Sequence, residues 1–126
     1  MKNGCLLDTN ILIYLSQGNE KVKKALQRLN QEFFFISVIS YFEFLDGHKT
    51  PEEFALFQER LQNLAPLDFT REIAKRAAEL DRLTNRKIKL KGLFIAATAE
   101  VEKLTLVTAD KGFKRVKGLK VKLLEP

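Results

Sequence analysis

The sequence is poor in sulfur and imidazole ligands, with one cysteine and one histidine among 126 residues. A single cysteine excludes an intrachain disulfide and a cysteine-based zinc site. Cys5 falls inside an apolar run, where a small buried side chain is expected. His48 falls in a Gly-His-Lys-Thr-Pro turn and is expected to be exposed. Neither residue is therefore available as a catalytic nucleophile.

Long apolar runs are absent too. No stretch approaches the ~18 residues of a membrane span, and residues 1–4 lead into the first apolar run without a hydrophobic leader. These absences predict a soluble protein of the reducing cytoplasm with no membrane partner. The length of 126 residues and the 45% hydrophobic content predict a single domain, 1–126.

The net charge of +6 makes an anionic partner such as nucleic acid plausible. The same excess of lysine and arginine is also found in proteins whose charged side chains are only solvated. Short apolar runs alternate with longer amphipathic ones, which is typical of an α/β fold. Strands are predicted at 5–8, 33–37, 105–108 and 119–123, with a weaker extended piece at 65–69. Helices are predicted at 11–15, from 19 or 20 to 29, and at 38–45, 51–61 and 93–103. A further helix is predicted to follow Thr70, its N-cap, and to reach Leu83. The basic run 86–91 is interpreted as a short edge strand or a loop on the rim of a site.

Three acids mark the ends of these elements. Asp8 closes the first apolar run, Asp110 closes the last strong strand, and Glu43 interrupts a Phe-rich helix. In an open α/β sheet the site lies outside the carboxyl ends of the strands, so these acids are expected to converge. Converging carboxylates repel by about 4 kcal/mol per pair at 4 Å and an effective dielectric of 20. At least one of them should therefore have a raised pKa in the metal-free protein.

Such a cluster suits Mg²⁺ or Mn²⁺, which prefer oxygen ligands and keep several waters. A metal-bound water can attack a phosphodiester while the ion polarises the phosphoryl oxygen. The chemistry that the acids best support is hydrolysis of a nucleic-acid backbone.

Each acid also has a purely structural interpretation. Asp8, or the neighbouring Thr9 or Asn10, could cap the following helix, and Asp110 could cap a turn through 111–113. Glu43 could be a solvated helix residue. Its flanking phenylalanines, Phe42 and Phe44, instead favour a partly buried position.

Four segments resemble one family. The segments 6–12 (LDTNILI), 40–47 (SYFEFLDG), 94–99 (FIAATA) and 106–110 (LVTAD) are similar to PIN domains, specifically VapC-type toxins of toxin–antitoxin pairs. This resemblance covers essentially the whole chain. It implies a three-layer α/β/α domain with a mainly parallel central sheet. It also implies a Mg²⁺- or Mn²⁺-dependent endoribonuclease that acts on RNA, forms a homodimer and is silenced by a cognate antitoxin.

The resemblance assigns roles to individual residues. The catalytic and metal-binding residues would be Asp8, Glu43 and Asp110. The substrate-binding residues would be Thr9, Asn10 and Thr108.

The chain departs from the family pattern at two glycines. Gly92 stands where the pattern has a further metal-site acid, and Gly112 stands where an acid or Asn is often found. Gly92 is either native or a single-base change of an Asp codon, and it predicts an attenuated nuclease. Two alternatives therefore stay open: a catalytically silent PIN domain that binds RNA or an antitoxin, and a response-regulator receiver. The receiver fits less well, since Asp8 is followed by Thr9 and Asn10 rather than by another acid.

Overall fold

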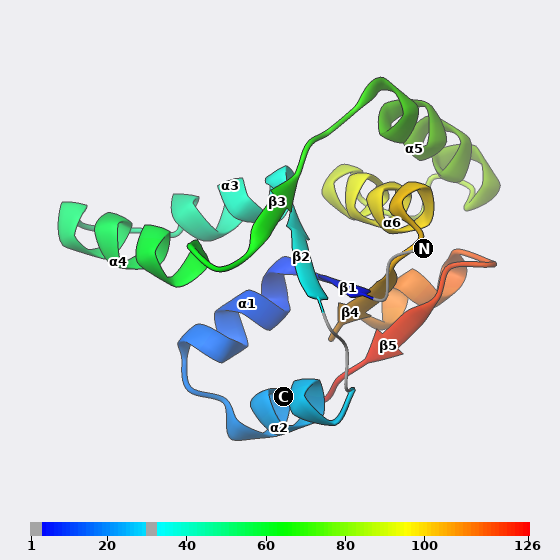
Figure 1. Cartoon of the computed structure of the whole chain (residues 1–126). Helices are drawn as coiled ribbons and strands as arrows, with labels where there is room; N and C mark the ends of the chain where they lie inside the picture. Colours follow the sequence, from blue (N-terminus) through cyan, green and yellow to red (C-terminus); the bar gives the residue numbers. More distant parts are fainter. Residues whose placement is uncertain (1–3, 30–32) are drawn as a thin grey trace.

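A sheet of five strands forms the centre of the protein (Figure 1). The computed structural model describes residues 4–29 and 33–126. The strands are β1 (Gly4–Leu7), β2 (Phe33–Ser37), β3 (Ala65–Leu67), β4 (Thr105–Thr108) and β5 (Val121–Leu123). Their order in the sheet is β3-β2-β1-β4-β5, and every neighbouring pair is parallel. The predicted α/β class with a mainly parallel sheet is confirmed.

Pairs of helices connect the strands. They are α1 (Thr9–Ser16), α2 (Glu20–Arg28), α3 (Val38–Asp46), α4 (Pro51–Leu61), α5 (Arg71–Leu83) and α6 (Leu90–Glu102). A short 3-10 helix, η1 (Lys111–Arg115), follows β4. Helices α1 and α2 join β1 to β2, and α3 and α4 join β2 to β3. The chain therefore runs from the central strand β1 to the edge strand β3. It then returns through α5 and α6 to β4, beside β1.

Side chains of the central strands alternate between two cores. In β1, Leu6 packs with α5, α6 and Phe113, whereas Cys5 and Leu7 pack with α1, α2 and parts of α3 and α4. This alternation is the two-residue period of a strand. Since both faces of the sheet are covered by helices, the strands have continuous apolar runs. The predicted three layers and the buried position of Cys5 are confirmed.

Helix α6 differs most from its prediction. It begins at Leu90 rather than at residue 93, so Gly92 is the third residue of the helix and not its boundary. Glycine is least costly in a first turn, where the backbone is only partly committed to helical hydrogen bonds. Residues 86–89 of the basic run are accordingly a loop, and residues 90 and 91 begin α6, so the run is not an edge strand.

Two sequence expectations concern exposed and terminal segments. His48 is exposed, as predicted. Within the described part of the chain, no helix has both the length and the apolar character needed to cross a membrane. Residues 1–3, where no hydrophobic leader was expected, lie outside the described residues.

Candidate active site

The strand order creates a crevice between β1 and β4. Connections leave these neighbouring strands toward opposite faces of the sheet, and such switch points are where open α/β sheets bind ligands. Asp8 directly follows β1, Asp110 lies two residues beyond β4, and Glu43 lies in α3, which directly follows β2. All three acids line one pocket of about 820 Å³.

Asp8 is the most enclosed of these acids, with 7% of its surface exposed. Its Oδ1 accepts a hydrogen bond from Thr9 N at 2.8 Å, so it caps α1, and its Oδ2 accepts one from Thr108 Oγ1 at 2.6 Å. Burial raises the pKa of the Asp8 carboxyl. The two hydrogen bonds lower this pKa in part, and the charges of Glu43 and Asp110 raise it further. A raised pKa within the cluster is therefore confirmed for Asp8, with burial rather than repulsion as the largest cause.

A fully buried hydroxyl connects Asp8 to Asp110. Thr108 Oγ1 donates to Asp8 and accepts from the backbone N–H of Asp110 at 3.0 Å. Asp110 Oδ1 in turn accepts from Gly112 N at 2.8 Å and caps η1. Asn10 lines the pocket, and its Oδ1 accepts from Ala109 N at 3.3 Å. Thr108 itself does not line the pocket, and its contacts orient the two acids.

Glu43 is held by a chain of hydroxyl groups. Thr9 Oγ1 donates to Glu43 Oε1 at 2.7 Å and also lies 3.0 Å from Ser40 Oγ. A threonine hydroxyl has one hydrogen, so Ser40 must be the donor in the second contact. Ser37 Oγ lies 3.4 Å from Ser40 Oγ and accepts from Ser40 N. Neither serine was assigned a role in the site from the sequence. The signal was the position of Ser40, about one helical turn before Glu43.

The phenylalanines beside Glu43 do not enclose it as predicted. Phe42 is 57% exposed, and the ring of Phe44 packs against that of Phe57 with centroids 4.8 Å apart. Successive residues of a helix point about 100° apart, so neighbours in sequence need not share an environment. Glu43 is nevertheless partly buried, with 22% of its side chain exposed, and Thr9 and Ser40 contact or flank it.

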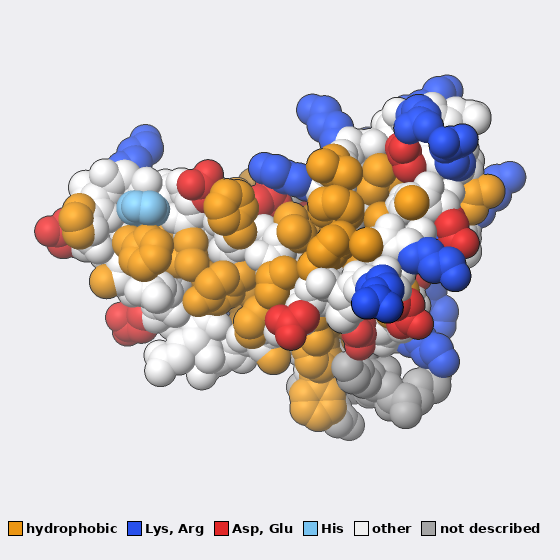
Figure 2. Space-filling view, turned by 90° about the horizontal axis from the view of Figure 1, so that it is seen from above, with side chains coloured by type: hydrophobic (Ala, Val, Ile, Leu, Met, Phe, Trp, Pro, Cys, Tyr) orange, Lys and Arg blue, Asp and Glu red, His pale blue; other side chains and the backbone are white. Residues whose placement is uncertain are grey.

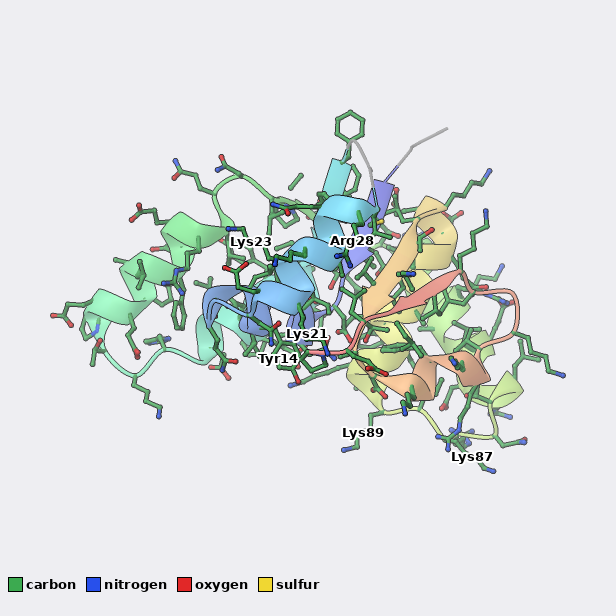
Figure 3. The ribbon with its side chains drawn as sticks, turned by 90° about the horizontal axis from the view of Figure 1, so that it is seen from below. Tyr14, Lys21, Lys23, Arg28, Lys87 and Lys89 are labelled. Atoms are coloured by element: carbon green, nitrogen blue, oxygen red, sulfur yellow. The ribbon has the colours of Figure 1, made fainter. Side chains whose placement is uncertain are left out.

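Four cations also line the pocket: Lys87, Lys89, Lys91 and Arg115. Lys87 and Lys89 extend outward from the segment before α6 (Figure 3). The Lys91 ammonium instead lies 3.2 Å from Glu43 Oε2. Sequence reasoning interpreted most lysines of this run as a solvated face and missed this ion pair.

Gly92 leaves room for a side chain at the pocket. A Cβ atom built there would lie 3.1 Å from Ile88 Cγ2 and 3.6 Å from Phe113 Cζ. A small shift of the Ile88 side chain would therefore accommodate a larger residue. At the second departure, a Cβ on Gly112 would lie 3.1 Å from Asp110 Oδ1.

The pocket can be compared with the needs of a metal ion. Among residues 4–29 and 33–126, no three carboxylate, imidazole or thiol side chains lie close enough together to enclose a metal alone. Mg²⁺ does not need such a cage, since it is commonly bound through one or two carboxylates, several waters and substrate phosphates. The donors in this pocket are oxygens, and the pocket has room for water. These residues therefore fit a hydrated, hard divalent cation and not a softer metal.

The PIN domain family model matches residues 5–119. The chain therefore belongs to the PIN domain family, whose members are in general nucleases that use divalent metal ions. A search of curated proteins gives no match.

Solved structures narrow the similarity to VapC-type toxins. VapBC2 from Rickettsia felis, bound to a DNA fragment from its promoter, has a TM-score of 0.84 and 27% identity, covering 97% of this chain and 99% of that one. A toxin–antitoxin complex from Klebsiella pneumoniae has a TM-score of 0.78 and 30% identity, covering 94% and 95%. FitAcB from Neisseria gonorrhoeae has a TM-score of 0.79 and 26% identity, covering 93% and 95%. The predicted resemblance to VapC-type PIN toxins is confirmed.

Proposed function

We propose that the protein is a metal-dependent endoribonuclease of the VapC toxin type, and that Asp8, Glu43 and Asp110 hold Mg²⁺ or Mn²⁺. The observation that carries this proposal is the convergence of the three carboxylates, from segments far apart in sequence, on one pocket. Asp8 is buried there although burial disfavours its charged form. A bound cation would offset both that burial and the repulsion between the acids.

The protein's own contribution to the reaction is positioning. When bound, the metal would activate water and polarise the scissile phosphate. Thr108 and the Thr9 backbone fix the two oxygens of Asp8, and the Thr9 hydroxyl fixes Glu43. Asn10 ties the start of α1 to the segment that carries Asp110. Ligands held in this way keep their geometry when substrate enters, which is what a preorganised site requires.

Cations around the pocket would bind the RNA backbone. Lys87, Lys89 and Arg115 line the pocket, where they can contact phosphates next to the cleaved bond. Such contacts are electrostatic and independent of sequence, so RNA affinity should fall as salt rises. The pocket-lining residues Thr9 and Asn10 would lie next to the bound strand.

Gly92 would attenuate the enzyme. A glycine contributes no charge to the metal site, so Asp8, Glu43 and Asp110 would bind one ion with reduced affinity. A second ion, which some nucleases use, would lack ligands. Attenuation rests on this missing charge and not on a missing pocket.

We also propose a cognate antitoxin and a second copy of the chain as partners, in the cytoplasm, with 1–126 as a single domain. Large hydrophobic side chains are exposed, among them Leu83, Leu90 and Phe42, at 69%, 63% and 57%. Hydrophobic side chains gather over the middle of the face seen in Figure 2. Exposed apolar surface of this kind is typical of a region that a partner covers.

The test is cleavage of a mixed RNA pool with Mn²⁺, using wild type and Asp8→Asn. We expect slow cleavage by wild type that stops with a chelator, and none by Asp8→Asn. Asp46→Asn is the matched control, since it makes the same chemical change at an exposed end of α3, outside the pocket. Equal cleavage by wild type and Asp8→Asn would refute the proposal.

The second candidate is a silent PIN domain that binds RNA or an antitoxin without cleaving. Gly92 and the Lys91–Glu43 ion pair favour it, because one removes a negative charge from the pocket and the other neutralises one. Tight RNA binding with no cleavage at high Mn²⁺ would support this candidate over the enzyme.

A further inference from the structure

An internal cation already occupies part of the acidic pocket. The ammonium of Lys91, in the first turn of α6, lies 3.2 Å from Glu43 Oε2 in α3. Glu43 Oε1 is engaged by the Thr9 hydroxyl at 2.7 Å. Oε2 accepts no such hydroxyl hydrogen bond within the described part of the chain, and it is the oxygen that Lys91 contacts.

The start of α6 is an unusual place for a lysine. Helices α2, α4 and α5 carry acids in their first turns and capping side chains, as the helix dipole favours. Helix α6 has neither an acid in its first turn nor a capping hydrogen bond from a side chain. It has Lys89 at the cap and Lys91 two residues on, so the local dipole opposes these cations. The contact with Glu43 compensates Lys91, whereas no such contact is found for Lys89 among the described residues.

The Lys91 side chain lies largely in solvent. It is 62% exposed, and Glu43 is 22% exposed, so the ammonium reaches into the pocket from the solvent side. An ammonium and a divalent ion at the same carboxylate repel each other, and the smaller, doubly charged ion interacts more strongly with the carboxylate. A metal bound at Glu43 would therefore displace the ammonium from this carboxylate. The Lys91 side chain lines the pocket, so the displaced ammonium would remain near its edge.

We propose that Lys91 is an exchangeable counter-ion: it neutralises Glu43 in the metal-free protein, and on metal binding it transfers to a phosphate oxygen of the RNA. This inference rests on the proposed function, since it places the metal at Glu43. Before metal binds, Lys91 would compete with the metal for Glu43. After metal binds, Lys91 would contact the RNA substrate. This exchange also gives the pocket a resting state in which neither metal nor RNA is bound tightly.

The first test needs no catalysis. Mn²⁺ binding is measured by calorimetry on metal-free wild type, Lys91→Met and Lys89→Met. Methionine is unbranched like lysine and one heavy atom shorter, so it keeps most of the side chain and removes the charge. We expect Lys91→Met to tighten Mn²⁺ binding roughly three- to tenfold, because the competing ammonium is gone. Lys89→Met removes an equal charge from the same pocket without breaking an ion pair, so its effect should be clearly smaller.

The second readout follows the ammonium directly. In ¹⁵N-lysine NMR spectra, the ammonium resonance assigned through Lys91→Met should shift when Mg²⁺ is added, and that of Lys89 should change less. The shift reports release from Glu43, which a merely structural ion pair would not show.

The outcomes separate this inference from the proposed function. If Mn²⁺ binds wild type and Lys91→Met equally, or the Lys91 resonance stays fixed while metal binds, the exchange is refuted and the nuclease proposal stands. If neither protein binds Mn²⁺, both are refuted. Tighter binding by Lys91→Met than by Lys89→Met, with a Lys91 shift, supports both.

Discussion

Gly92→Asp should restore a metal-site charge. The new Cβ would lie 3.1 Å from Ile88 Cγ2, a contact that a small side-chain shift relieves, and 3.6 Å from Phe113 Cζ. The carboxylate would stand in the first turn of α6, a helix without a first-turn acid, where the dipole favours it by typically 0.3–1 kcal/mol. The substitution should therefore fold well and place the charge beside the pocket.

The expected gain follows from the charges. A carboxylate attracts a unit positive charge by about 4 kcal/mol at 4 Å and an effective dielectric of 20, and a divalent ion more. Asp8 and Asp110 would repel the new carboxylate in the metal-free protein. This repulsion destabilises the metal-free state and so adds to the gain in Mn²⁺ affinity. Desolvation and water-mediated contact subtract from it. We expect Mn²⁺ affinity to rise about ten- to a hundredfold, about 1.4–2.8 kcal/mol, and RNA cleavage to rise with it.

The assay pairs calorimetry of Mn²⁺ binding with cleavage of a mixed RNA pool. Gly92→Asn is the matched control, because it introduces nearly the same volume without the charge. We expect Mn²⁺ to bind more tightly to Gly92→Asp than to wild type, and no more tightly to Gly92→Asn than to wild type. Equal Mn²⁺ affinity in the Asp and Asn variants would show that charge at this position does not limit metal binding, and the silent binding module would then be the better account.

Two further predictions concern the metal-free site. The pKa of Asp8 is higher in the folded than in the unfolded protein. Its contribution to the unfolding free energy is therefore fully present below the unfolded-state pKa, and it is lost as pH rises through the folded-state pKa. Urea unfolding at a series of pH values should show this loss in wild type but not in Asp8→Asn, and parallel profiles would contradict it. Thr108→Val leaves Asp8 Oδ2 without its donor and Asp110 N without its acceptor, both near a fully buried side chain. We expect a cost of about 1–3 kcal/mol in unfolding free energy, with Thr108→Ser close to wild type, and an equal loss in both would contradict the hydrogen-bond explanation.

The backbone of the site could be predicted from sequence because each part has a local cause. Burial of both faces of the sheet makes β1 and the middle of β4 continuous apolar runs, and parallel strands bring their carboxyl ends to one edge. The capping interpretations of Asp8 and Asp110 also hold, and they coexist with positions in the pocket. The alternatives of cap and site were not exclusive, since each carboxylate oxygen has two lone pairs and can accept a capping N–H while it faces the pocket.

What sequence reasoning missed depends on contacts between distant segments. The Lys91–Glu43 pair joins residues that no periodicity relates, and the hydroxyl contact from Thr9 to Glu43 spans 34 positions. The expected burial of Glu43 by Phe42 failed because neighbours on a helix point in different directions. The start of α6 was misplaced because Gly92 was interpreted as a boundary, whereas the helix begins before it.

The central claim is that a divalent metal binds between Asp8, Glu43 and Asp110. The most direct measurement is an anomalous difference map from crystals of the wild-type protein grown with Mn²⁺. The account predicts one manganese peak in the pocket. The ion should contact at least one of the three carboxylates directly and the others directly or through water. The Lys91 ammonium should have moved away from Glu43. An empty pocket at a Mn²⁺ concentration that supports RNA cleavage, or a peak bound elsewhere on the protein, would contradict it.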